Sequence, residues 1–251
     1  MTPIISIGIP SYEMKSFGSE YLRYLLQSIA SQEFENFEVC ISDHSQNDEI
    51  LDLCGEFANY FTVKYFKNEE KRGNCSNNIN SVVEMCEGKI TKLIFMDDLL
   101  IDPQALSYIN YIYENEKCNW CLNGFAHTTD GKTHERIKVP QWTDMMLEGR
   151  NLLGNPSGVS FLTDKFEGFD EKLDLLLDTD FYHRMRYTHG MPYIIAKTLT
   201  SNREHNNRLS SSGINYNAKV DHPEGGWLVN KEELEYVLEK NKDTREYPDE
   251  T

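Results

Sequence analysis

The chain has 251 residues, which suits one α/β domain with a sizeable core and a small appended segment. Its formal net charge of −16 argues against nucleic acid as a partner and against simple electrostatic docking on anionic lipid, because both are negatively charged. No apolar run approaches the roughly 18 residues of a membrane span, and the opening PIISIGIP carries no basic leader. We therefore expect no transmembrane segment and a cytoplasmic protein, with peripheral attachment at the inner face of a membrane left open.

Strand-like and helix-like stretches alternate over the first hundred residues. Apolar runs predict strands at 4–9, 37–42, 62–66 and 93–96. Helical spacing predicts a first helix with an apolar stripe from Leu22 to Ile29 and Ser19 as its N-cap, followed by helices at 50–58 and 76–87. This order predicts an α/β fold with a Rossmann-like, mostly parallel central sheet and helices on both faces.

The second half of the chain is less regular. Asp102 and Pro103 open a further helix, strand-like runs lie near 119–126, 158–162 and 192–199, and a helix is expected near 178–189. Two stretches rich in Gly, Asn, Ser and Thr, 127–156 and 201–226, are expected to be loops, and long loops in a compact domain are often functional. Residues 230–241 predict a charged terminal helix, and 242–251 a frayed tail.

Three acidic clusters carry the strongest chemical signal: Asp43, Asp97 with Asp98, and Asp178 with Asp180. The first two follow strand-like runs, and in an open α/β sheet ligands bind beyond the carboxyl ends of the strands. Carboxylates that converge on one crevice repel each other unless a cation lies between them. A divalent cation that bridges to the phosphates of a ligand is the usual solution.

The six cysteines mostly occupy apolar positions, as reduced core cysteines do. Cys118 and Cys121, followed by His127 and His134, leave a structural zinc site as an alternative. Their spacing is shorter than in common zinc fingers, which argues against it. A redox role is expected still less, because no helix begins there to lower the thiol pKa.

Five segments, in order, resemble the inverting glycosyltransferases of the GT-A fold, specifically family 2. They are ISIGIPSYE, LLQSIASQEFENFEVCISDHSQND, the pair Asp97-Asp98 after KLIFM, GFDEKLDLLLDTDFYHRM, and the basic stretch from Arg203 to Arg208. The resemblance covers roughly residues 3–210. It implies one GT-A domain over 1–215, with a nucleotide-sugar-binding half at 1–98 and an acceptor-binding half at 99–215, and a C-terminal loop, helix and acidic tail over 216–251.

The resemblance also implies roles for individual residues. One group would bind the donor nucleotide: Pro10, Ser11, Tyr12 and Glu13 under the base, Asp43 at the base or ribose, and Asp97 near the ribose. A second group would act on the diphosphate: Asp98 and His205 through Mn²⁺ or Mg²⁺, and Arg203 and Arg208 directly or as part of a closing loop. A third group would act at the acceptor: Asp178 as catalytic base, with Asp180 and Asn155 on the acceptor side.

The implied chemistry has its own physical logic. An acceptor hydroxyl must attack the anomeric carbon in line with the leaving diphosphate, and the cation stabilises the charge that gathers there. Because the pKa of the hydroxyl is far above 7, a carboxylate base is needed on the opposite face. The partners would be a nucleotide-diphosphate sugar and a glycan, lipid-linked or other hydroxyl acceptor, in polysaccharide or glycan assembly.

The chain departs from the family pattern at four positions: Ser42, His44, Phe95 and Leu177 stand where an acid, a glycine, an acid and a glutamate are usual. These departures leave nucleotide preference and metal affinity open. Asp178 could instead be a helix N-cap, and His205 a polar loop residue. Two other functions stay open, a sugar nucleotidyltransferase and a catalytically inactive nucleotide-sugar-binding module.

Overall fold

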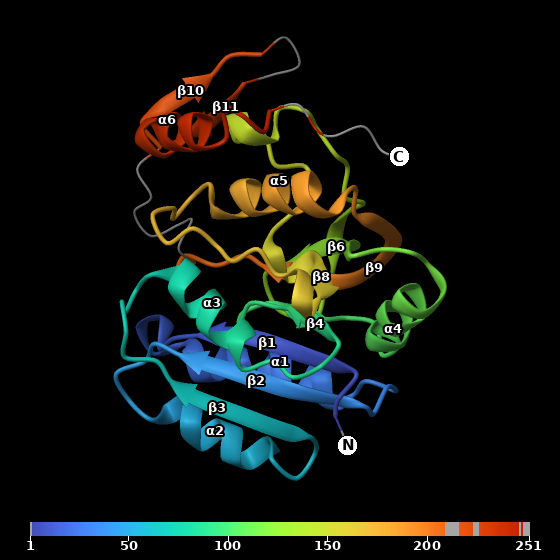
Figure 1. The fold of residues 1–251 in the computed structure, drawn as a ribbon. Helices are drawn as coiled ribbons and strands as arrows, with labels where there is room; N and C mark the ends of the chain where they lie inside the picture. The colour runs from blue at the N-terminus through green and yellow to red at the C-terminus, as the bar shows by residue number, and fades with distance from the viewer. Residues whose placement is uncertain (1, 209–215, 223–225, 246, 248–251) are drawn as a thin grey trace.

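The computed structural model describes residues 2–208, 216–222, 226–245 and 247. Over these residues a nine-stranded sheet runs through the molecule in the order β3-β2-β1-β4-β8-β6-β9-β5, with β7 paired to β6 (Figure 1). Its strands are β1 (Ile5–Ser11), β2 (Phe37–Asp43), β3 (Thr62–Lys67), β4 (Ile90–Leu93), β5 (Leu99–Leu100), β6 (Trp120–Thr128), β7 (Glu135–Lys138), β8 (Val159–Leu162) and β9 (Tyr193–Arg203).

The first four strands of the chain form the parallel part of this sheet. β1 pairs in parallel with β2 and β4, and β2 with β3. The second half makes the sheet mixed, because β8 runs antiparallel to both β4 and β6, and β5 antiparallel to β9, while β6 and β9 are parallel. The predicted α/β class is therefore confirmed, and the antiparallel strands belong to the half that the sequence left irregular.

Helices cover both faces of the sheet, as predicted. One hydrophobic cluster contains side chains of α1 (Gly18–Ala30), α2 (Glu49–Phe57) and α4 (Ala105–Asn115). A second cluster contains side chains of α3 (Cys75–Glu84), α5 (Leu177–His189) and α6 (Lys231–Lys240). The sheet residues divide between them by alternation, with Ile7 in the first cluster and Cys40 in the second.

Several local predictions differ from the structure. α1 begins at Gly18 with Phe17 as its N-cap, and the Ser19 hydroxyl donates to Glu49 instead. The fourth strand ends at Leu93, so residues 94–98 form a turn in which the backbone N–H of Asp98 donates to the carbonyl of Phe95. Asp97 and Asp98 thus lie between β4 and β5, and not at the last residues of a strand.

The two predicted loops also contain strands. β7 lies within 127–156, and β9 continues to Arg203. A hairpin of β10 (Ala218–Val220) and β11 (Trp227–Val229) precedes α6. The hairpin and α6 lie together beyond α5, at the end of the molecule farthest from α2 and β3 (Figure 1).

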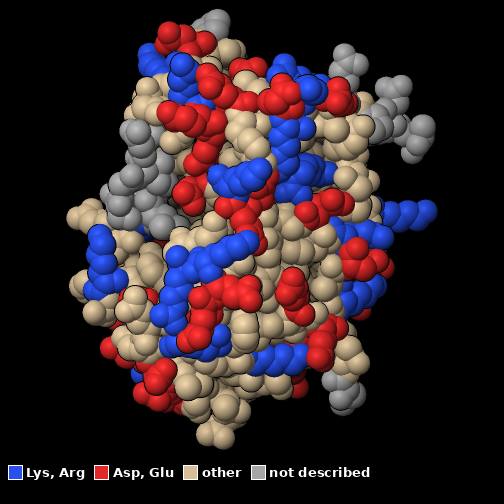
Figure 2. Space-filling model, turned by 60° about the vertical axis from the view of Figure 1, so that its left-hand side comes forward, with Lys and Arg blue, Asp and Glu red and all other residues tan. Residues whose placement is uncertain are grey.

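Charge and membrane features complete the outline. On the face shown in Figure 2, acidic and basic side chains are interspersed, so the net negative charge of the chain is not gathered there in one patch. Among the helices that the structure describes, none has both the length and the apolar character needed to cross a membrane.

Candidate active site

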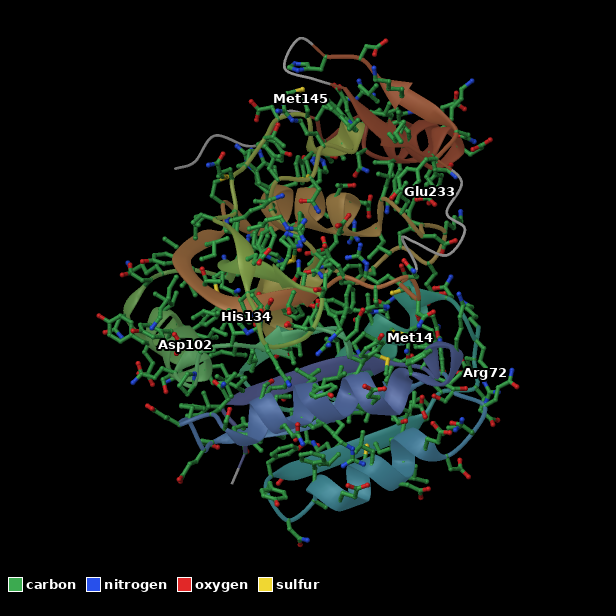
Figure 3. The ribbon with its side chains drawn as sticks, turned by 180° about the vertical axis from the view of Figure 1, so that it is seen from behind. Met14, Arg72, Asp102, His134, Met145 and Glu233 are labelled. Carbon is green, nitrogen blue, oxygen red and sulfur yellow. The ribbon has the colours of Figure 1, made fainter. Side chains whose placement is uncertain are left out.

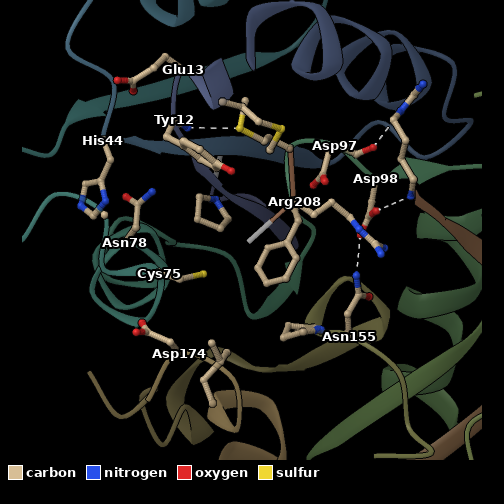
Figure 4. Close-up of a pocket in the computed structure, with 18 of the residues that line it drawn as sticks. Tyr12, Glu13, His44, Cys75, Asn78, Asp97, Asp98, Asn155, Asp174 and Arg208 are labelled. Atoms are coloured by element: carbon tan, nitrogen blue, oxygen red, sulfur yellow. Dashed lines mark hydrogen bonds between the residues drawn. The ribbon is translucent and has the colours of Figure 1, made fainter. Parts of the chain in front are cut away.

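A cavity of about 580 Å³ opens beyond the carboxyl ends of β1 and β2. Its walls come from the end of β1, the loop after β2, the start of α3, the β4–β5 turn, the end of β9 and the segment that leads into α5 (Figure 4). Of the predicted site residues, nine line this cavity: Pro10, Tyr12, Glu13, Asp97, Asp98, Asn155, Asp178, Arg203 and Arg208. Ser11, Asp43, Asp180 and His205 are not part of its lining.

Asp97 and Asp98 form a buried acidic pair in the β4–β5 turn. Asp98 is held by neutral donors, since its Oδ2 accepts from Asn155 Nδ2 at 2.8 Å and its Oδ1 accepts from the backbone N–H of Arg203 at 2.8 Å. Burial and the neighbouring charge of Asp97 raise the pKa of Asp98 to about 7. Within the described residues, no Lys or Arg side chain forms an ion pair with Asp98, and its hydrogen-bond donors are neutral.

His205 is a direct partner of Asp97. Its Nε2 lies 2.9 Å from Asp97 Oδ2, and its Nδ1 accepts from the backbone N–H of Asn207 at 3.1 Å. This pattern assigns the ring proton to Nε2, which donates to the carboxylate. The ring also stacks on Tyr21, with centroids 4.5 Å apart. His205 thus orients Asp97, and it would bind a cation itself only by giving up that hydrogen bond.

Asp178 lies in the first turn of α5 and lines the cavity. The N-cap of this helix is Leu176, so Asp178 does not have the N-cap role that the sequence left open. Its Oδ2 accepts from Asn151 Nδ2 at 2.7 Å, and its Oδ1 accepts from the backbone N–H of Thr179 at 2.8 Å. Burial raises the pKa of Asp178 to about 6, which suits a proton acceptor near neutral pH.

The two predicted arginines differ in their surroundings. Arg203 Nε donates to the Asp97 carbonyl at 3.2 Å, and the guanidinium packs over the rings of Tyr21 and Tyr24. Arg208 reaches into the space that Tyr12, Asp98 and Asn155 border (Figure 4). Its Nε is buried and has no hydrogen-bond partner within the described residues. A buried, unpaired cationic donor on a cavity wall points to an anionic ligand.

The loop predicted to lie under a nucleotide base is divided by the pleat of β1. Pro10 and Tyr12 face the cavity, whereas Ser11 is fully buried and its hydroxyl donates to the Ser42 carbonyl. Tyr12 donates its hydroxyl to the Asn207 carbonyl at 3.3 Å, and burial raises its pKa. This bond ties the β1 loop to the segment that carries His205 and Arg208.

Asp43 lies behind the cavity wall. Its carboxylate accepts from the Tyr65 hydroxyl at 2.8 Å and from the backbone N–H of Ser45 at 2.9 Å, and Lys67 Nζ lies 3.6 Å away. These contacts fix the turn after β2, whose His44 and Gln46 line the cavity. The direct contact with base or ribose that the resemblance implies therefore finds no support in the position of Asp43.

Asp180 points away from the cavity. Its carboxylate accepts from Arg184 Nε and Lys240 Nζ, each at 2.9 Å, and from Asn241 Nδ2 at 3.1 Å. Two residues along a helix turn the side chain by roughly 200°, so Asp178 and Asp180 face opposite ways. The predicted acceptor-side position of Asp180 finds no support in these contacts, which join α5 to α6.

Sequence reasoning missed several polar residues of the cavity, among them His44, Gln46, Arg72 and Asn78. Asn78 donates to the Ser11 carbonyl at 3.0 Å and accepts from the Ser42 hydroxyl at 2.7 Å, which ties α3 to β1 and β2. The signal was present in the run CSNNIN, because asparagines on the buried face of a short helix need specific partners.

The zinc alternative has no supporting geometry. Cys121 Sγ lies 2.9 Å from Ser160 Oγ inside the sheet, and His134 Nδ1 lies 3.0 Å from Ser201 Oγ. Within the part of the chain that the structure describes, no three His, Cys, Asp or Glu side chains are grouped so that they could hold a metal ion.

Comparisons with known proteins agree with one another. The family model "Glycosyl transferase family 2" matches residues 6–174. An uncharacterized glycosyltransferase of Haemophilus influenzae is 26% identical over 233 residues, which are 83% of this chain and 71% of that protein. The chondroitin synthase of Escherichia coli is 31% identical over 106 residues, 41% of this chain and 14% of that much longer protein.

Two solved structures are similar in fold. S. aureus TarS 1–349 in complex with UDP-GlcNAc superposes with a TM-score of 0.71 at 16% identity, over 96% of this chain and 66% of that chain. The mannosyltransferase PcManGT from Pyrobaculum calidifontis, in complex with GDP-Man and Mn²⁺, gives a TM-score of 0.57 at 12% identity, over 80% of this chain and 57% of that chain. The family match spans most of the chain, and the sheet has the GT-A arrangement of these neighbours. The chain belongs to glycosyl transferase family 2 and is a glycosyltransferase of the GT-A fold.

Proposed function

We propose that this glycosyltransferase moves a sugar from a nucleotide-diphosphate sugar to a hydroxyl acceptor, with inversion and with the help of a divalent cation, in polysaccharide or glycan assembly. The observation that carries the proposal is one cavity that holds three complementary groups. These are the Asp97–Asp98 pair, the cation Arg208 with its unpaired buried Nε, and Asp178 with its raised pKa. The bound UDP-GlcNAc of TarS and GDP-Man of PcManGT support a sugar-nucleotide donor.

The residues of the acidic pair fit a divalent cation. The two oxygens of Asp98 accept from Asn155, Ser157 and the backbone N–H of Arg203, which together use three of about four lone-pair sites of a carboxylate. Mg²⁺ and Mn²⁺ are commonly held by one or two carboxylates, with phosphate oxygens and waters completing the shell. Asp97 and Asp98 would hold the ion, and His205 would orient Asp97 through its Nε2–H. Such a cation would stabilise the negative charge that develops on the leaving diphosphate.

Asp178 would take the proton of the acceptor. In the proposed transfer, the acceptor oxygen forms a bond to the anomeric carbon as the bond to the diphosphate oxygen breaks, and the hydroxyl proton passes to Asp178. Asn151 holds Oδ2 by its 2.7 Å hydrogen bond, so the carboxylate cannot turn freely. A base held in this way on the face opposite the leaving group produces inversion.

Arg208 would pair with the diphosphate. Its position supports this role, because it extends from the segment after β9 into the same cavity as the acidic pair. The sequence also predicts that 201–213 closes over the donor. Residues 201–203 belong to β9, and 209–213 lie outside the described residues.

A screen of nucleotide sugars tests the proposal. The purified protein with Mn²⁺ should hydrolyse one or more of them slowly, and NMR of the sugar released at early times should show an inverted anomeric centre. Isothermal titration should show nucleoside diphosphate binding that EDTA abolishes. Binding without turnover of any donor would instead favour an inactive binding module. Release of pyrophosphate from a nucleoside triphosphate and a sugar phosphate would favour a nucleotidyltransferase.

A further inference from the structure

A carboxylate of α6 lies against the segment that leads into α5. Glu233, on α6 (Figure 3), accepts hydrogen bonds from three successive backbone N–H groups. Their donor atoms lie at 3.2 Å in Asp174, 3.0 Å in Leu175 and 2.9 Å in Leu176. Three adjacent N–H groups that converge on one anion form a strongly held contact. Asp174 and Leu175 line the cavity, so this contact fixes part of its wall.

This contact lies at the start of α5, where the N-cap position has no side-chain cap of its own. Leu176 occupies that position and makes no capping hydrogen bond through its side chain. The first N–H groups of a helix are unpaired within the helix and carry the positive end of its dipole. Of the three N–H groups that Glu233 binds, only that of the N-cap Leu176 belongs to this helix end, and those of Asp174 and Leu175 precede it. Glu233 thus places a negative charge beside the helix end from another element, 57 residues away from Leu176 in sequence. Asp178 follows two residues after the N-cap.

α6 is also anchored on both sides of residues 174–176, at Asp170 and at Asp180. Asn230 caps α6 by accepting from the backbone N–H of Glu233 at 3.0 Å. Lys240, at the other end of α6, donates to both Asp170 at 2.6 Å and Asp180 at 2.9 Å. Val237, between them, is fully buried in the hydrophobic cluster that also contains α5. Glu233 therefore extends from a helix whose position relative to α5 is fixed.

We propose that Glu233 is a positioning residue of this enzyme, which holds residues 174–176 so that Asp178 faces the acceptor; the catalytic part of this inference rests on the proposed function. α6 lies beyond the 6–174 segment that the family model matches, so this device belongs to the C-terminal part of the chain. Glu233 also adds its negative charge to the surroundings of Asp178, where burial is the main cause of the raised pKa. Among the described residues, Cys75 of α3 and Tyr182 of α5 also interact electrostatically with Asp178.

The test compares Glu233→Gln with Glu235→Gln. Glu235 is on the same helix, its side chain is 67% exposed, and it pairs only loosely with Lys231 at 3.7 Å, so its variant controls for the loss of one charge. Amide hydrogen exchange over 174–176 and thermal denaturation report on the contact itself. Steady-state kinetics with the best donor, measured across pH, report on its consequence for the reaction.

We expect faster exchange at 174–176 in Glu233→Gln, because one amide oxygen cannot serve three N–H groups as a carboxylate does. The kcat should fall by roughly 10- to 100-fold, the usual cost of displacing an aligned group by up to an ångström. The fall in kcat should exceed any rise in the donor KM, because Asp178 acts only in the transition state, whereas Asp174 and Leu175 form only part of the cavity wall. Removing a negative charge lowers the pKa of Asp178, so the acid limb of kcat should move to lower pH. Glu235→Gln should match the wild type in all four measurements.

Unchanged exchange at 174–176, or a kcat and acid limb equal to the wild type, would overturn the inference. If Glu233→Gln does not fold, Glu233→Asp serves instead, because it keeps the charge on a shorter side chain. An intermediate kcat of this variant would support a positioning role. A wild-type kcat together with slowed folding would oppose it. A wild-type protein inactive on every donor would overturn the proposed function and the catalytic part of this inference. Exchange at 174–176 would still decide whether Glu233 holds the cavity wall.

Discussion

Replacement of Asp178 by Asn separates a catalytic from a structural role most sharply. The side chain keeps its size, and its one remaining oxygen can still accept from the Thr179 N–H. The new amide nitrogen then faces Asn151 Nδ2, which is also a donor, so the 2.7 Å hydrogen bond is lost. The variant can no longer accept a proton from a hydroxyl group.

The expected changes in stability and activity have opposite signs. In the folded protein the pKa of Asp178 rises from 3.8 to about 6. Near pH 7 the ionised carboxylate therefore lowers the free energy of unfolding by roughly 3 kcal/mol. The lost hydrogen bond and the unpaired donor cost about 1–3 kcal/mol, so the variant should be as stable as the wild type or slightly more stable. Loss of general-base help should lower kcat by roughly 10²- to 10⁴-fold, with donor binding unchanged.

The assay pairs transfer kinetics with thermal denaturation and nucleoside diphosphate titration. In the wild type, kcat should rise with pH through about 6, because Asp178 must be ionised to act as a base. Saturating Mn²⁺ keeps the acidic pair from contributing to that limb, since a bound cation favours ionised carboxylates. If a well-folded Asp178→Asn protein kept near-normal kcat, or the pH dependence through 6 persisted in it, the assignment of the base would be refuted.

Three further substitutions test the donor side of the cavity. Asp98→Asn should stay folded and lose metal-dependent nucleotide binding; equal affinity with and without EDTA, matching the wild type, would contradict the cation site. Arg208→Gln should weaken nucleoside diphosphate binding by roughly 10- to 100-fold, the worth of a charged hydrogen bond, and leave binding of the free nucleoside unchanged; equal losses for both ligands in titration would oppose contact with the diphosphate. Asp43→Ala should raise the donor KM by disturbing His44 and lower the free energy of unfolding by about 1–3 kcal/mol, through unpaired donors at Tyr65 and Ser45; a change confined to kcat would count against it.

The predictable part of the fold is the part built from buried parallel strands. β1 and β2 are covered on both faces, so most of their residues are apolar and the strands can be recognised from the sequence alone. β5 and β7 have two and four residues; β5 pairs with β9, which is distant in the chain, and β7 pairs with the preceding strand β6. Segments this short carry too little pattern to be distinguished from loops, so β5 and β7 were not predicted, whereas the strand-like runs near 119–126, 158–162 and 192–199 correspond to β6, β8 and β9.

The sequence predicts which segments of the chain reach the cavity, but it does not predict which of their side chains point into it. The motif at 178–180 correctly brings the start of α5 to the cavity, but it does not say which of its two acids faces inward. Likewise the end of β2 reaches the cavity through His44, while Asp43 turns inward to Tyr65. Glu233 could not be predicted at all, because its partners are backbone N–H groups that no sequence pattern marks.

The partners of each carboxylate separate those used for folding from those available for chemistry. Asp180 is held by Arg184 and Lys240, and Asp43 has Lys67 within 3.6 Å, so protein cations already compensate their charges. Within the described residues, Asp98 and Asp178 are hydrogen-bonded to neutral amide, hydroxyl and backbone donors, and burial raises both of their pKa values. A buried carboxylate without a compensating cation is costly to the folded state. Such a carboxylate is useful to an enzyme when a bound metal ion, or the proton that it accepts during the reaction, supplies the missing positive charge. By this criterion the acids of the chain divide between the cavity and the core as the proposed reaction requires.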